Sequence, residues 1–409
     1  MPMLGGHRLG VLCGGHALFS ALVSAMDAAT HSVHLETYIL HPEGRALEVL
    51  AALERAARRG LDVRLVVDGV GSGRLAASWF ERLAAAGVQV RVYAPLGRLG
   101  LLIPSRWRRL HRKLCVVDGV LGFCGGINLQ DDWVALSDQP LSAPRIDYAL
   151  CGSGPLVRWM DATMHQLWWR MEVARDTRRR AFREAWRSWR THAQLQPDTL
   201  PIWLDAWWAQ RPAATAVHQA TAQLVLRDNV WHRRDIERVY LQAVRQAQQH
   251  VLLAHAYFVP SGRLASALVA AVARGVKVQV LMQGRYEGFM QFHAARPLYG
   301  RLLAGGVELH VCTHTDLHAK VAVVDGRWAT VGSSNLDPLS LLLAREANIV
   351  TTHPDVAAAL AADIGQHLIH SASRLDATAL QNRPWHQKAL DRLAFGLMRL
   401  AILVSGQRY

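Results

Sequence analysis

A histidine, a lysine and an asparagine recur at one spacing in two parts of this sequence. The matching pairs are His111 and His318, Lys113 and Lys320, and Asn128 and Asn335. Each pair is offset by 207 residues, about half of the 409-residue chain. An imidazole can act as a nucleophile or as an acid and base, while an ammonium and an amide can hold an anion. The pattern predicts a tandem duplication with chemistry on an anionic group.

Chance does not explain the repeated His-x-Lys pattern. The chain has 42 arginines but only four lysines, and two of the four follow a histidine by two residues, at Lys113 and Lys320. With 20 histidines and lysine at about one position in a hundred, fewer than one His-x-Lys is expected. A lone strand histidine is usually a core residue, but this paired pattern favours a catalytic interpretation.

Both copies are expected to lie on a β-hairpin. Residues i and i+2 of a strand share a face, so the histidine and lysine of each copy should project together. Asp118-Gly119 and Asp325-Gly326 are strong turn dipeptides, and strands over 120–124 and 327–331 should return antiparallel. We expect the two aspartates to anchor the structure rather than to touch substrate.

The returning strand of each hairpin ends in small residues next to the asparagine. These are Gly125 and Gly126 in the first copy and Gly332 and Ser333 in the second. Small residues allow backbone N–H groups to approach an anion closely. The hairpin therefore brings this segment and its asparagine back towards the histidine.

The flanking elements show that a whole domain is duplicated. In the first half, a strand-like pattern over 33–39 precedes a helix over 45–59, which Gly60 ends, and a strand over 63–67. In the second half a strand over 251–257 precedes a helix over 263–274, which Gly275 ends, and a strand over 276–282. Strands alternating with helices predict an α/β fold with a mixed sheet.

Bulk composition narrows the functional class. The formal charge of +14 and the pI near 10.2 indicate attraction to an anionic partner, either nucleic acid or a phospholipid surface. Five scattered cysteines without C-x-x-C spacing indicate unpaired thiols in a reducing compartment. We find no apolar run long enough to span a bilayer and no signal-peptide pattern, so we expect a protein in the cytosol or on the cytosolic face of a membrane.

The duplicated pattern H-x-K-x4-D-x6-G-[GS]-x-N resembles the phospholipase D superfamily. The resemblance implies two α/β domains related by a pseudo-two-fold axis, each a mixed sheet flanked by helices, which form one composite active site. It implies that one histidine attacks phosphorus to give a phosphohistidine and that the other transfers protons, while the lysines and asparagines hold phosphate oxygens. It implies no metal and no other cofactor.

The resemblance also implies an acidic residue that orients each histidine. Asp147 lies eight residues before Pro155, and Glu346 lies eight before Pro354, so the two correspond. Such a carboxylate fixes the imidazole tautomer and raises its basicity. The alternative for each is an ordinary surface carboxylate.

Residues 332–340, at the end of the second motif, and residues 344–348, which follow it, are similar to the corresponding segments of bacterial cardiolipin synthases. The length of the chain resembles that of the shorter, B-type group. The resemblance implies transfer of a phosphatidyl group between two phosphatidylglycerol molecules, with release of glycerol, at the cytoplasmic face of the bacterial inner membrane. Asp131-Asp132-Trp133 in the first copy differs from Leu336-Asp337-Pro338 in the second, so the halves are expected to differ in role. We favour His111 as the nucleophile and His318 as the acid and base, an assignment that sequence symmetry leaves open.

We divide the chain into a first domain over 1–155, an Arg/Trp-rich segment over 156–212, a second domain over 213–370 and an amphipathic tail over 371–409. Three stretches are candidates for membrane contact. The Arg/Trp-rich segment either meets lipid headgroups or is a basic linker whose tryptophans pack on the domains. The apolar loop over 96–103 either enters lipid or is buried, and the tail either lies on a bilayer or packs on the core.

The main alternative is another enzyme with the same core, either a lipid hydrolase or a nuclease. A nuclease would use the positive charge as a nucleic-acid groove. The apolar loop over 96–103 and the Trp-rich segment have no obvious use on DNA, so no nucleic-acid partner is expected. A catalytically dead membrane scaffold is disfavoured because both motifs are complete.

Overall fold

The chain forms two compact units, each described here by itself. The structure is a computed structural model that describes residues 2–97, 100, 107–135, 139–175, 200–211, 216–228, 232–284, 289–337, 344–376, 378 and 382–404. Unit 1 consists of Met1–Asp131 and Ala149–Leu224, and unit 2 consists of Asp132–Tyr148 and Val225–Tyr409. The segment Asp132–Tyr148 thus belongs to unit 2, although the sequence on both sides of it belongs to unit 1.

Unit 1 is built on a mixed β-sheet. Its strands are β1 (Leu4–Cys13), β2 (Ser32–Thr37), β3 (Asp62–Asp68), β4 (Gln89–Tyr93), β5 (Arg109–Leu110), β6 (Leu114–Val117), β7 (Leu121–Gly125), β8 (Tyr148–Ser153) and β9 (Ala216–Arg227). The order across the sheet is β9-β1-β8-β7-β6-β2-β3-β4. β2, β3 and β4 run parallel, whereas β6 is antiparallel to both β2 and β7.

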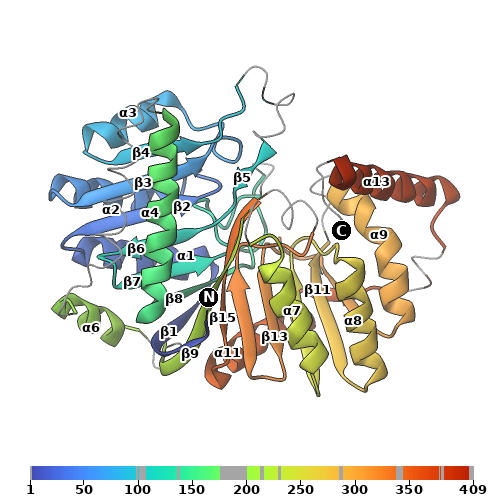
Figure 1. Ribbon diagram of the computed structural model, residues 1–409. Helices are drawn as coiled ribbons and strands as arrows, with labels where there is room; N and C mark the ends of the chain where they lie inside the picture. Colours follow the sequence, from blue (N-terminus) through green and yellow to red (C-terminus); the bar gives the residue numbers. More distant parts are fainter. Residues whose placement is uncertain are drawn as a thin grey trace. The chain divides into compact units, whose positions relative to one another are not determined.

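Helices cover both faces of this sheet. They are α1 (Gly14–Ala28), α2 (Ala46–Arg58), α3 (Ala77–Ala85), α4 (Pro155–Arg175) and α6 (Ile202–Ala209). α1 and α2 pack together on one face, and α4 crosses the other face, in contact with β1, β2, β6 and β7 (Figure 1). The unit is therefore a three-layer α/β arrangement.

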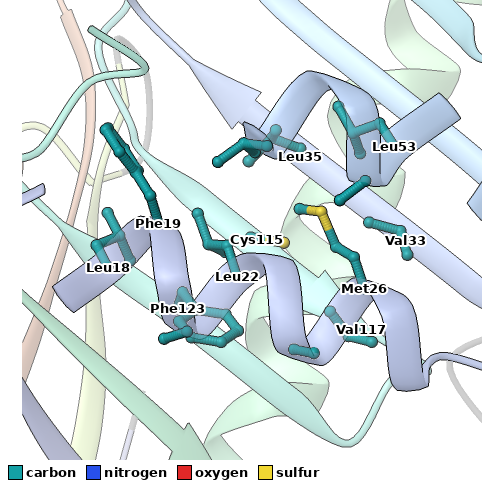
Figure 2. Close-up of a cluster of buried hydrophobic side chains, with 14 of the residues drawn as sticks. Leu18, Phe19, Leu22, Met26, Val33, Leu35, Leu53, Cys115, Val117 and Phe123 are labelled. Atoms are coloured by element: carbon teal, nitrogen blue, oxygen red, sulfur yellow. The ribbon is translucent and has the colours of Figure 1, made fainter. Parts of the chain in front are cut away.

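The spacing of apolar residues explains the main core of unit 1. Leu18, Leu22 and Met26 recur every four residues along α1 and so lie on one helix face. Figure 2 shows this face packed against alternate residues of the sheet, including Val33 and Leu35 of β2. Because side chains alternate along a strand, residues 34 and 36 of β2 face α4 instead.

Unit 2 repeats the plan. Its strands are β10 (His250–His255), β11 (Lys277–Gln283), β12 (Glu308–Cys312), β13 (Lys320–Val324), β14 (Trp328–Gly332), β15 (Ala344–Thr351) and β16 (Ala372–Arg374), in the order β16-β12-β11-β10-β13-β14-β15. Its helices are α7 (Asp235–Gln246), α8 (Gly262–Ala273), α9 (Phe289–Ala304), α11 (Pro354–His370) and α13 (Trp385–Val404). α7 and α8 share the main core with the sheet, and α11 contacts β12, β13 and β14.

The expected elements are present in both halves. The parallel pair β2 and β3, joined through α2, corresponds to the parallel pair β10 and β11, joined through α8. The antiparallel hairpin β6–β7 corresponds to β13–β14. The prediction of a duplicated α/β domain with a mixed sheet is confirmed.

The tryptophans of the Arg/Trp-rich segment divide into different environments. Trp168, Trp207 and Trp208 are buried in unit 1, where Arg91 stacks on Trp168 and Arg211 stacks on Trp207. Trp159 is exposed, and Trp186 and Trp189 lie outside the described residues. For the buried three, the structure favours packing on the domain over contact with lipid.

The other membrane candidates are described only in part. Of the apolar loop, Leu99, Leu101, Leu102 and Ile103 lie outside the described residues. The tail contains the predicted helix, α13, which packs along α9. Within the described residues, no helix combines the length and apolar character needed to cross a membrane.

The five cysteines are all described, and none forms a disulfide.

Candidate active site

The first motif gathers around the end of β2 in unit 1. The buried Lys113 donates from Nζ to the carbonyl oxygen of His111 at 2.9 Å. Tyr38 packs against both, with its ring centroid 4.8 Å from that of His111 and 5.3 Å from Lys113 Nζ. Asn128 accepts a hydrogen bond on Oδ1 from Ile39 N at 3.2 Å. The hairpin therefore brings the histidine, lysine and asparagine to one place, with Tyr38 and Ile39 between them.

The amide of Asn128 has unused donor capacity. The side chain is 2% exposed, and Nδ2 has no hydrogen-bond partner among the described residues. A buried N–H group without a partner costs about 1–3 kcal/mol. Next to it, Gly125 and Gly126 follow at the end of β7, and Gly125 N donates to Lys113 O at 3.4 Å. An anion at this place would satisfy the amide.

The second motif has the same arrangement in unit 2. Lys320, which is fully buried, donates from Nζ to the carbonyl oxygen of His318. Nζ also lies 2.8 Å from His318 Nδ1. Asn335 is 4% exposed, and its Oδ1 has no hydrogen-bond partner among the described residues. Each lysine is thus tied to the histidine two residues before it.

A carboxylate orients His318. Asp147 Oδ2 lies 2.7 Å from His318 Nδ1, and both side chains are buried. The backbone fixes this contact, because His318 N donates to Ile146 O and Ile146 N donates to Asp316 O, both at 2.8 Å. The contact with an ionised carboxylate places the ring proton on Nδ1, so Lys320 Nζ donates to the carbonyl oxygen of His318 and not to Nδ1, and Nε2 is left for the chemistry. Sequence reasoning found Asp147, but not that it serves the second histidine.

Glu346 holds the loop of the second motif. Its Oε2 accepts a hydrogen bond from Ser333 Oγ at 2.5 Å, and the side chain is fully buried. Ser333 N donates to Ala347 O at 3.0 Å, and Ser334 N donates to Asn348 Oδ1 at 3.3 Å. β15 therefore fixes the segment that leads from Gly332 to Asn335.

The two motif aspartates hold neighbouring strands. Asp118 accepts backbone hydrogen bonds from Thr30, His31 and Ser32, each at 2.8 Å. Asp325 accepts from the corresponding segment, Gln248 to His250, at 2.8–2.9 Å. Burial opposes ionisation of Asp325, but these backbone donors outweigh it and hold its pKa below the usual range. Both aspartates adopt positive φ, at 51° and 52°, and the following glycines complete the turn.

The buried His255 affects the charge around the second motif. It pairs with Lys320 in the β10–β13 register, and its Nε2 lies 3.2 Å from Tyr240 Oη. Burial, and then the charge of Lys320, lower the pKa of His255 to about 3. This histidine therefore stays neutral and does not compete with Lys320 for an anion. This histidine could not be singled out from the sequence, since a strand histidine is usually a core residue.

Sequence reasoning also missed a buried charged layer between the sheet of unit 1 and α4. Arg112, between the motif histidine and lysine, forms a two-pronged ion pair with Glu36 at 3.0 and 3.1 Å. Next to it, His34 contacts Asp161 at 3.3 Å and Asp62 at 3.6 Å. The alternation of strand faces could have revealed this layer, because Glu36 and His34 occupy the face opposite the core.

One group in this layer has the composition of a metal site. Ligand atoms of His34, Asp161 and His165 all lie within 4.8 Å of one another. However, Arg64 Nη1 lies 3.2 Å from His165 Nδ1, and Arg64 also pairs with Asp62 at 2.7 Å. A guanidinium in this position repels a cation, so the geometry favours an ion-pair network.

The comparisons with known proteins decide the family. Residues 22–138 and 240–368 match the family model described as cardiolipin synthase, PLD-like domain. The chain belongs to this family. Both matched segments contain one of the His-x-Lys motifs, so the cardiolipin synthase, PLD-like family accounts for both halves, and the protein is an enzyme of the phospholipase D superfamily.

Similarity to individual family members extends over nearly the whole chain. Cardiolipin synthase B of Salmonella typhi is 34% identical over 96% of this chain and 88% of its own length. Cardiolipin synthase B of Escherichia coli K12 is 33% identical over the same shares. Cardiolipin synthase of Geobacillus sp. (strain WCH70) is 30% identical over 94% of this chain and 70% of its own length.

A solved structure shares the family fold. The crystal structure of phosphatidylserine synthase from Haemophilus influenzae Rd KW20 matches with a TM-score of 0.66, over 99% of this chain and 96% of that one. The two sequences are 14% identical, so this likeness shows the fold alone.

The charged layer predicts a pH-dependent stability. Burial opposes protonation of His34, but its contacts with Asp161 and Asp62 outweigh burial and raise its pKa above 6.5. Burial likewise opposes ionisation of Asp62 and Asp161, yet His34 and Arg64 lower both pKa values below 3.8. The stabilisation by His34 is complete below pH 6.5 and is lost as pH rises through its raised pKa. The stabilisation by Asp62 and Asp161 is complete above pH 3.8, and it is lost as pH falls through their lowered pKa values.

We therefore expect His34→Gln to lower the free energy of unfolding by about 1–2 kcal/mol near pH 5–6, because the partly buried Asp161 and Asp62 lose their contacts with a protonated imidazole. The loss should shrink as pH rises through the raised pKa of His34, where the ring gives up its proton. Urea unfolding across this pH range measures the effect. His314→Gln, at an exposed position, is the control. A pH-independent loss would contradict the ionic account.

Gly332 is predicted to be irreplaceable for a steric reason. A Cβ there would lie 2.2 Å from Asn348 Oδ1 and 2.5 Å from Ala347 O. We expect Gly332→Ala to destabilise the protein by about 3 kcal/mol, since β15 must shift. Gly365→Ala on α11 is the control: its Cβ meets no atom within 4 Å, and it should stabilise by up to about 1 kcal/mol. Equal melting temperatures for the two variants would contradict this.

Proposed function

We propose that the protein is a cardiolipin synthase that transfers a phosphatidyl group from one phosphatidylglycerol to a hydroxyl of another and releases glycerol. The observation that carries the proposal is the geometry around His318, where a buried carboxylate holds Nδ1 at 2.7 Å beside a buried lysine. That arrangement suits an imidazole that gives and takes protons. Family membership and the relatives' names support the substrate class.

The reaction needs two imidazoles, and each motif supplies one. We propose that Nε2 of His111 attacks the phosphorus of phosphatidylglycerol while His318 protonates the departing glycerol oxygen. The phosphorus–oxygen bond breaks as the phosphorus–nitrogen bond of a phosphatidylhistidine forms. His318, now neutral, removes a proton from a hydroxyl of the second phosphatidylglycerol, and that oxygen displaces His111 from phosphorus.

The division of roles follows from the surroundings of His318. A carboxylate at Nδ1 stabilises the imidazolium form, which is the form a general acid requires. We assign Glu346, which corresponds to Asp147 in the internal repeat, the equivalent function towards His111. Both motifs then serve a single phosphorus atom, because neither alone has both an attacking and a proton-transferring imidazole.

The remaining motif residues are proposed to bind the phosphate oxygens. Lys113 and Lys320 carry positive charge in nearly water-free positions, where electrostatic attraction is strong. Asn128 adds an amide donor that lacks a partner among the described residues. These groups stabilise the negative charge as it redistributes in the transition state.

We propose that the enzyme works as a peripheral protein at the cytoplasmic face of the bacterial inner membrane, where phosphatidylglycerol is available. The formal charge of +14 supports attraction to an anionic bilayer. A water-poor, lipid-covered site would favour the alcohol over water as the acceptor.

Lipid products test the proposal directly. Purified protein is incubated with detergent-dispersed phosphatidylglycerol and separately with single-stranded DNA, and products are separated chromatographically. We expect cardiolipin and glycerol in equal amounts and no DNA cleavage. Phosphatidic acid as the main product would indicate a hydrolase, and DNA cleavage without lipid product would indicate a nuclease. Either result would overturn the synthase assignment.

A further inference from the structure

Helix α13 of unit 2 presents apolar side chains to solvent. Trp385 is 80% exposed, Leu393 is 57% exposed and Leu397 is 47% exposed, and Leu390 is also exposed. Residues spaced by three, four and seven lie on one face of a helix, so Leu390, Leu393 and Leu397 form one row. We call these three leucines the outer row. A surface helix ordinarily exposes polar residues to solvent, whereas α13 exposes leucines.

Buried contacts fix the rotation of α13. On its inner face, Ala394 is fully buried with Ala295 and Val259. Asp391 is buried too: its Oδ1 lies 2.6 Å from His293 Nδ1 on α9, and its Oδ2 pairs with Arg383. Turning the helix to hide the outer row would expose Ala394 and separate this carboxylate from its partners. In Figure 1, α13 lies along α9.

Helix α13 also carries positive charge. Arg392 is exposed on this helix, and Lys388, which is half-exposed, lies one turn before it on the same side of the helix. The acidic residue among the described residues of the helix is Asp391, which is buried and pairs with Arg383 and His293 on the inner face. The exposed surface of α13 therefore carries leucines, a tryptophan near the start of the helix and an exposed arginine.

We propose that the outer face of α13 is a docking surface for an anionic phospholipid bilayer. The leucines of the outer row enter the boundary between headgroups and acyl chains, and Trp385 lies at the headgroup level. Lys388 and Arg392 meet lipid phosphates. Charge complementarity favours a bilayer over a second copy of this chain, which would bring like cations together. The proposal rests on the proposed function only for the identity of the lipid, since the enzyme must reach phosphatidylglycerol in a membrane.

Vesicle sedimentation of the full-length protein tests the docking surface. The probe is vesicles of phosphatidylglycerol and phosphatidylethanolamine, with phosphatidylcholine vesicles as the uncharged comparison. The variant Leu390→Ser/Leu393→Ser/Leu397→Ser should lower the partition constant for the vesicles by roughly 10- to 100-fold. Lys388→Gln/Arg392→Gln should weaken binding to the anionic vesicles alone and make it less dependent on salt. Ile369→Ser on α11, where the isoleucine is 71% exposed, is the matched control and should bind as the unaltered protein does.

Two further measurements keep the outcomes distinct. Activity on detergent-dispersed phosphatidylglycerol should be unchanged in the triple serine variant, because the outer row touches no motif residue of unit 2. Unaltered vesicle binding by this variant, with the melting temperature preserved, would overturn the docking surface and leave the synthase proposal standing. A change from dimer to monomer in light scattering, with vesicle binding retained, would show an interface between copies and would also overturn it. Absence of lipid product from the unaltered protein in detergent would instead count against the proposed function.

Discussion

Replacing either His111 or His318 by alanine is expected to lower cardiolipin formation by at least about a thousandfold. His111→Ala removes the proposed nucleophile, and His318→Ala removes the proposed proton donor. Because the two act on one phosphorus atom, the double variant should be scarcely worse than either single variant. Initial rates on detergent-dispersed phosphatidylglycerol measure the effect.

The control for this pair is His314→Ala, which removes an exposed histidine close to the second motif. It should retain full activity. If either motif variant kept about half of the activity, each half of the chain would contain an independent site. That result would contradict the composite mechanism even if the product were still cardiolipin.

Asp147→Asn is expected to lower kcat by roughly 100- to 10,000-fold while changing KM little. The amide can still accept a hydrogen bond from His318 Nδ1, but it no longer stabilises the imidazolium. The acidic limb of the pH–rate profile should also move, because the pKa of the proton donor depends on this carboxylate.

Asp355→Asn serves as the control for this prediction. Asp355 lies in the first turn of α11 and is exposed, so the loss of its charge should leave both kcat and the pH profile unchanged. A loss of activity in Asp147→Asn with an unshifted pH profile would assign Asp147 a purely structural role. Recovery in Asp147→Glu would support the carboxylate function.

Much of the fold could be predicted from the sequence because local patterns and global structure agree. The helix expected over 45–59 is α2 at Ala46–Arg58, and the strand expected over 63–67 is β3 at Asp62–Asp68. Gly60 adopts positive φ directly after α2, as the end of a helix requires. The Asp-Gly turns form because both of their residues adopt positive φ, which Asp and Gly tolerate well.

The histidine, lysine and asparagine of each motif could also be found from the sequence, because spacing on a hairpin determines which residues share a face. The partner of His318 could not be found in this way. Asp147 reaches it through pairing of the segment Asp132–Tyr148 with the residues before β13, and such long-range pairing leaves no periodic pattern in the sequence. The alternation of strand faces places Glu36 opposite the core, but its pairing with Arg112, 76 positions away, likewise has no signal in the spacing.

For part of the Arg/Trp-rich segment, the structure chooses between the two interpretations that composition left open. Its tryptophans and arginines suggested lipid headgroups, but Trp168, Trp207 and Trp208 pack inside unit 1, where arginines stack on their rings. Arg and Trp attract each other within a protein as readily as they attract a membrane. For the tail, the sequence left contact with a bilayer and packing on the core open, and the structure shows which side of α13 is buried.

The most direct test of the central claim is to identify the residue that carries the covalent lipid. Phosphatidylglycerol with a labelled phosphatidyl group is mixed with the enzyme, the reaction is quenched rapidly in alkali, and peptides are analysed by mass spectrometry. We predict a phosphatidyl group on His111 that disappears when unlabelled phosphatidylglycerol is added as acceptor. An adduct on His318 would exchange the two proposed roles. Turnover to cardiolipin without an adduct on either histidine would contradict the phosphohistidine mechanism.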